Sequence, residues 1–178
     1  MAFAFKKAGL VLGFLSFAVM AFAVSIVIVI AKQLWPSGEF TVCNSFTGLC
    51  ETVFLGETCL MSDKSVNICA YGYATAAIGV IACVFTLFAA CLPAMVSLLL
   101  SLFGSVWWLA YSITATVYNN DLPGGYPRGY YRNVVIALSW TTFACCVLSV
   151  VLAIKMRGNE KKKDARDKPQ FQEAPAVV

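Results

Sequence analysis

The chain has 178 residues, a net charge of +4, and 60% hydrophobic against only 12% charged residues. A soluble domain carries about 25% charged residues, so this composition excludes an ordinary soluble fold and leaves no room for a separate soluble catalytic domain. The absence of histidine also removes histidine-dependent hydrolytic triads and histidine-ligated haem.

The first apolar run, residues 8–31, follows Lys6 and Lys7. A cleaved signal peptide is the alternative, because Ala21 and Ala23 form a small-x-small pattern after a basic start. The run nevertheless continues for about 24 residues, which is the length of a full membrane span. We therefore predict a retained transmembrane helix over 8–31.

The next segment, residues 32–69, is a long loop with more acidic than basic side chains. Basic residues favour the cytoplasmic side of a membrane, so Lys6 and Lys7 indicate that this loop lies outside or in a lumen. The segments 40–43 and 49–54 are rich in strand-forming residues and flank a turn-like stretch, so the loop is expected to hold a small β-hairpin.

Four cysteines belong to this loop or its edge. In an oxidising compartment an even set of four predicts up to two disulfides, with three possible connectivities that the sequence leaves open. Zinc binding is the alternative, but there is no Cys-x-x-Cys spacing and no histidine, so we expect no metal. The disulfide candidates are Cys43, Cys50, Cys59 and Cys69.

Residues 69–118 contain no ionisable Asp, Glu, Lys or Arg. As one helix this stretch would extend about 75 Å, whereas the hydrocarbon core of a bilayer is about 30 Å thick. Pro93 lies near its middle, and proline interrupts a helical hydrogen-bond ladder. The stretch is therefore predicted to be a transmembrane hairpin with spans at 70–91 and 95–117.

A short loop over 118–132 leads to a fourth span at 133–154, which ends before Lys155 and Arg157. The predicted fold is an all-α integral membrane protein: a four-helix transmembrane bundle over 1–156 with a disulfide-stabilised outer loop. Four spans return the chain to its starting side, so both termini are expected to be cytoplasmic. The tail, 157–178, has too little apolar surface to fold alone and is expected to be disordered.

Small residues recur at helical spacing in three of the spans. Such faces let helix backbones approach closely, which is a main source of packing energy in lipid. They are expected to pack the bundle internally, or to dock a partner or a second copy of the chain. The helix-packing candidates are Gly9, Gly13, Ser97, Ser101, Ser105, Thr141, Cys145, Ser149 and Ala153.

Two further features point to lipid. Cys91, near the cytoplasmic surface, is a candidate for palmitoylation. Lys161, Lys162 and Lys163 are candidates for attracting anionic lipid, with a solvated tail as the alternative.

None of the four spans holds an ionisable Asp, Glu, Lys or Arg, so neither a proton relay nor catalysis is expected. No cofactor and no nucleic-acid partner is expected; the expected partners are membrane lipids and other membrane proteins or self.

The four-span layout resembles the MARVEL-domain tetraspan proteins, in particular their synaptogyrin and synaptophysin branch. The resemblance rests on residues 68–73 leading into 77–83, on 105–110 and on 134–140. It implies a non-enzymatic protein of vesicle or plasma membranes that organises lipids and partner proteins in trafficking.

Two other interpretations stay open. Trp35, Gly48, Leu49, Cys50 and Cys59 resemble the first outer loop of claudin-like cell-contact proteins, although Cys50 stands where that motif has tryptophan. Alternatively, a small chain with packing faces and no chemistry of its own suits an accessory subunit of a larger membrane complex, such as a pump, a channel or a photosynthetic assembly.

Overall fold

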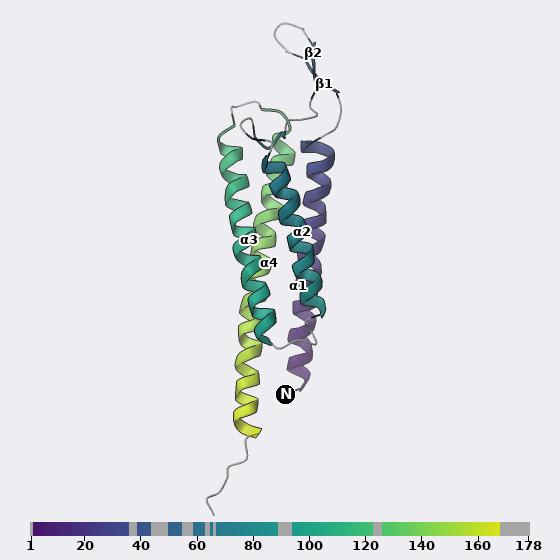
Figure 1. Cartoon of the computed structure of the whole chain (residues 1–178). Helices are drawn as coiled ribbons and strands as arrows, with labels where there is room; N and C mark the ends of the chain where they lie inside the picture. Colours follow the sequence, from purple (N-terminus) through teal and green to yellow (C-terminus); the bar gives the residue numbers. More distant parts are fainter. Residues whose placement is uncertain are drawn as a thin grey trace, which may run out of the picture.

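A computed structural model describes residues 2–35, 39–43, 50–54, 59–62, 65, 67–88, 94–122 and 126–167. The described chain forms a bundle of four long helices (Figure 1). They are α1 (Ala2–Val29), α2 (Asn67–Phe88), α3 (Ala94–Asn120) and α4 (Gly129–Asp167). All four are long and apolar enough to cross a membrane, as the sequence predicted.

The helices form a ring in the order α2, α1, α4, α3. The most extensive contacts join α3 to α4, and α1 touches both α2 and α4. The seam between α2 and α3 is the sparsest between neighbours, although these helices are consecutive in the chain. In Figure 1 the start of α1 and the end of α4 lie at the same end of the bundle, opposite the strands.

At the other end α1 continues into a short π-helix, η1 (Ile30–Leu34). The Trp35 amide donates to the Ile30 carbonyl at 2.7 Å, which closes this wider turn. Two strands follow, β1 (Glu39–Cys43) and β2 (Cys50–Phe54). They pair antiparallel, in a register that sets Cys43 opposite Cys50.

The segment after the strands is anchored to this end of the bundle. A disulfide joins Cys59 to Cys69 at the start of α2, and the Leu60 amide donates to the Leu34 carbonyl at 2.8 Å. Cys59, Leu60 and Met61 are buried in the same cluster as Leu34. A covalent bond, a backbone hydrogen bond and apolar burial thus fix the loop to both η1 and α2.

Two boundaries differ from those expected. The prediction of disorder from residue 157 is wrong for 157–167, because α4 continues to Asp167. Residues 159–167 contain neither glycine nor proline and include several strong helix formers. They extend a helix that the membrane segment has already nucleated, so these residues do not bear the free-energy cost of forming a first helical turn. The reversal expected at Pro93 and the rest of the tail, 168–178, lie outside the described residues.

Candidate functional site: the seam between α2 and α3

The upper half of the seam, toward η1, is held by two glycines of α2. Gly72 and Gly79 are seven residues apart, which is close to two helical turns and places both on one face. A β-carbon at Gly72 would lie 2.8 Å from the Tyr111 hydroxyl and 2.6 Å from Ile30 Cδ1. At Gly79 it would lie 2.9 Å from Trp108 Cζ2. Two aromatic rings of α3 therefore pack directly on the α2 backbone, which only glycine permits.

These rings belong to a connected aromatic cluster. The centroids of Tyr71 and Tyr111 are 5.5 Å apart, and those of Trp108 and Tyr111 are 6.0 Å apart, both in edge contacts. Tyr111 and Trp108 are almost fully buried. Each such pair contributes about 0.5–1.5 kcal/mol beyond its buried area, so the cluster makes the upper seam rigid.

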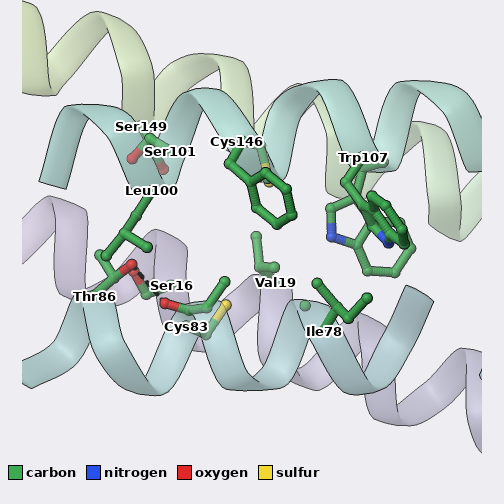
Figure 2. Close-up of a pocket in the computed structure, with 15 residues that line it drawn as sticks. Ser16, Val19, Ile78, Cys83, Thr86, Leu100, Ser101, Trp107, Cys146 and Ser149 are labelled. Atoms are coloured by element: carbon green, nitrogen blue, oxygen red, sulfur yellow. Dashed lines mark hydrogen bonds between the residues drawn. The ribbon is translucent and has the colours of Figure 1, made fainter. Parts of the chain in front are cut away.

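Below Gly79 the seam opens into a cavity of about 40 Å³. Figure 2 shows Ile78, Cys83 and Thr86 of α2 facing Leu100 and Trp107 of α3 across it. The helices α1 and α4 close the back of the cavity, and its wall includes the small residues Ala82, Ser101, Gly104, Cys146 and Ser149. The cavity lies between two membrane helices rather than at the end of the bundle.

The hydroxyl groups of this wall are largely used within their own helices. Ser101 donates to the Ser97 carbonyl at 2.9 Å, and Thr86 donates to the Ala82 carbonyl at 2.8 Å. Ser149 donates to the Cys145 carbonyl, also at 2.9 Å. The cavity therefore offers few free hydrogen-bond donors, although several of its residues are nominally polar. Trp107 is the exception, because its buried indole N–H has no acceptor in the described part of the chain.

A second polar site lies where α4 begins. Arg132 is buried, and its Nε donates to Asn119 Oδ1 at 2.9 Å. Its other nitrogens donate to the backbone carbonyls of Pro127 and Tyr126, and the guanidinium lies 5.2 Å from the centroid of the Tyr126 ring. One side chain thus ties the end of α3 and the residues before α4 to the bundle.

Arg128 makes a related link. It has a positive φ of 60° immediately before α4, and its guanidinium donates to Gln33 Oε1 in η1. A left-handed conformation costs a residue with a β-carbon about 1–2 kcal/mol. The hydrogen bond to η1 offsets part of that cost and ties the residue before α4 to η1.

The structure distributes the predicted packing residues unevenly. Ser97, Ser101, Ser105, Ser149 and Ala153 are buried inside the bundle, and Cys145 is half-buried. Thr141, by contrast, is exposed.

The remaining packing candidates are the two glycines of α1. A β-carbon on Gly13 would meet no atom within 4 Å, so no close approach in the described structure requires a glycine there. Gly9 belongs to α1, but its surroundings are outside the described residues.

Of the disulfide candidates, Cys59 and Cys69 are bonded, while Cys43, the last residue of β1, lies opposite Cys50, the first residue of β2. Cys91 lies outside the described residues, and Lys161, Lys162 and Lys163 fall in the last turns of α4. Within the described residues, no group of three or more Cys, Asp or Glu side chains is placed to hold a metal.

Sequence reasoning missed the glycine notches, which are the contacts at Gly72 and Gly79, and the buried Arg132. The spacing of the two glycines is visible in the sequence, and so is the spacing of Trp108 and Tyr111. Neither spacing, however, says which helix faces which. In the sequence, Arg132 is a basic residue of a short loop and gives only a weak signal about topology. The sequence does not show that neighbouring residues supply carbonyl acceptors for its guanidinium.

No protein-family model, curated protein or solved structure matches this chain. The family resemblance and the function it implies therefore stay predictions, and the function proposed for the chain depends on its own geometry.

Proposed function

We propose that the chain is a non-enzymatic four-pass membrane scaffold that organises neighbouring membrane proteins and lipids, in vesicle trafficking or in the formation of membrane domains. The observation that carries the proposal is the division of side chains between the inside and the outside of the bundle. The inside holds apolar side chains, two aromatic rings that pack on glycines, and hydroxyls of which several bond within their own helices. The outside is a broad surface of large apolar side chains.

The outer face of α1 shows this division clearly. Large apolar side chains recur every three to seven residues along it, each exposed by 46–75%: Leu10, Phe14, Phe17, Val24 and Ile28. Comparable exposed side chains follow α3 and α4, among them Leu99, Val106, Leu148 and Ile154. In a bilayer these faces contact lipid or other spans, and a scaffold acts through such surfaces.

In the proposed orientation the bundle lies in a vesicle or plasma membrane, and both termini lie on the cytoplasmic side. The start of α1 and the end of α4 share one end of the bundle (Figure 1), and both carry basic residues, as cytoplasmic segments do. The strand pair and the Cys59–Cys69 disulfide then belong to the outer or lumenal side, where disulfides persist.

An accessory subunit of a larger membrane complex is the second candidate, and the length of α4 favours it. Its 39 residues correspond to about 58 Å, roughly twice the hydrocarbon thickness. The helix therefore continues beyond the membrane as a rod, which offers a docking surface to a larger assembly.

Purification of the tagged full chain from its own cells in mild detergent, followed by mass analysis of the intact complexes, tests both candidates. The scaffold proposal expects mostly free or homo-oligomeric protein with several partners below equal stoichiometry. One large partner at fixed stoichiometry would support the subunit hypothesis, and self-polymers at cell contacts would support the claudin-like hypothesis; either result overturns the proposal. A variant ending at Asn159 keeps the four spans and tests whether the α4 extension holds the partner.

A further inference from the structure

We infer that the cavity between α2 and α3 is a binding site for the hydrocarbon chain of a bilayer lipid. Its walls are formed by helices that are long and apolar enough to cross a membrane. It depends on the four helices lying in a membrane, and not on which partners the scaffold holds.

The depth of the cavity identifies the part of the lipid that enters it. Gly104 follows Ala94, the first residue of α3, by ten residues, which is about 15 Å along the helix and about half the thickness of the hydrocarbon core. Cys146, on the wall formed by α4, also lies well inside its helix. Headgroups do not reach this depth, so the occupant is an acyl chain.

The chemistry of the walls favours hydrocarbon over water. Ser101, Thr86 and Ser149 use their hydroxyl protons on carbonyls of their own helices, and the other lining atoms are mostly apolar. A buried water needs two to four polar partners, and Trp107 is the lining residue whose buried donor is left without an acceptor in the described structure. An unfilled space would cost the wall its dispersion contacts, whereas an acyl chain restores them.

The size of the cavity separates a lipid chain from a partner helix. A helix with its side chains is about 10–12 Å wide, far too wide for a cavity of about 40 Å³. The contacts at Gly72 and Gly79 hold α2 and α3 together above the cavity. The seam between these helices is therefore closed in its upper half. The terminal carbons of a single hydrocarbon chain match this small volume, and the surrounding bilayer supplies them.

Gly104 is the position at which the site can be filled without disturbing the packing around it. A β-carbon there would lie 3.8 Å from Cys146 Sγ, an ordinary contact, with no other atom that close. Larger side chains at this position extend into the space the lipid would occupy. Ala110 is the matched control, because it is a small residue of the same helix that lies exposed on its outer surface.

The experiment reconstitutes the full chain into phosphatidylcholine vesicles that contain a phosphatidylcholine with a photoreactive diazirine in its acyl chain. Cross-linked residues are mapped by mass spectrometry. Wild type should give preferential cross-links to the cavity walls over the exposed faces of the same helices. Gly104→Leu should lower the cross-link yield in the cavity about fivefold, equivalent to about 1 kcal/mol of binding free energy, while Ala110→Leu should leave it unchanged.

A second filling variant, Ala82→Leu on the opposite wall, keeps the test decisive if Gly104→Leu fails to fold. Formation of the Cys59–Cys69 disulfide and the thermal midpoint in detergent report whether each variant is folded. Cross-links spread evenly around the bundle, or equal yields in folded filling variants and in Ala110→Leu, would show only surrounding bilayer lipid and would overturn the inference.

Discussion

Trp108 packs on Gly79 so closely that a β-carbon on the glycine would lie 2.9 Å from Trp108 Cζ2. The indole is 1% exposed and borders the cavity below it, so a methyl group on Gly79 would have to displace a buried ring. This contact closes the sparsest seam of the bundle at its middle and separates the rigid aromatic half from the cavity below.

Gly79→Ala should therefore destabilise the bundle, by about 1–3 kcal/mol, because overpacking forces rings or backbones to shift. The thermal midpoint in detergent, followed by tryptophan fluorescence, measures the effect. Gly13→Ala is the matched control in α1: its new methyl group meets no atom within 4 Å, so no loss is expected. Equal midpoints for the two variants would show that Trp108 does not hold the seam.

A second prediction concerns two hydroxyls that are buried without a partner in the described structure, those of Tyr111 and Thr75. A buried unsatisfied polar group costs about 1–3 kcal/mol, so Tyr111→Phe and Thr75→Val should leave the thermal midpoint unchanged or raise it. Each substitution removes an oxygen that makes no hydrogen bond within the described residues, and the new side chains keep nearly the same volume.

Ser112 supplies the control for this pair. It is equally buried, but its hydroxyl donates to the Trp108 carbonyl at 2.8 Å. Ser112→Ala should therefore lower the midpoint slightly. A large loss in Tyr111→Phe instead would reveal an acceptor for the tyrosine in the membrane-embedded protein.

The third prediction concerns the disulfide that fixes the outer loop. Cys59 and Cys69 are ten residues apart, and closing a loop of that length stabilises a fold by about 3 kcal/mol in the chain-entropy model. Replacing both with serine should lower the thermal midpoint. It should also increase protease cleavage near Leu60, whose backbone otherwise donates to Leu34.

Cys83→Ser tests whether this loss is specific to the bonded pair, because Cys83 is a buried free thiol in the second half of α2. The mass of the intact Cys83→Ser variant should change on reduction by the same amount as the mass of the wild type. If the double variant is as stable and as protease-resistant as Cys83→Ser, the disulfide contributes nothing to anchoring the loop.

The four spans could be predicted from the sequence because their signal is one-dimensional: long apolar runs interrupted by charge or by Pro93. Which helix faces which is not visible in such a signal. Small-residue spacing marks Ser101 and Gly13 alike, yet Ser101 is buried against the cavity, whereas a β-carbon added to Gly13 would meet nothing within 4 Å. Which small residue is used depends on the rotation of each helix, which periodicity within one helix does not fix.

The cavity could not be predicted from the sequence. Its wall draws on all four helices, and it exists because the notches at Gly72 and Gly79 end one turn above Cys83. The extension of α4 is hidden for a different reason. Charged composition predicts disorder for an isolated segment, whereas a helix that is already formed continues through charged residues that favour helix.

The last prediction concerns Arg132, whose guanidinium has only neutral acceptors in the described structure: the side chain of Asn119 and the carbonyls of Pro127 and Tyr126. Hydrogen bonds to a charged group contribute about 1.5–3 kcal/mol each when their loss leaves partners unsatisfied. Arg132→Lys keeps the charge but loses the planar fork that reaches three acceptors at once. It should therefore lower the thermal midpoint nearly as much as Arg132→Gln. Lys155→Gln, at an exposed position of the same helix, should leave the midpoint unchanged. Full stability in Arg132→Lys would mean that charge alone, and not the geometry of the fork, holds the end of α3 to the start of α4.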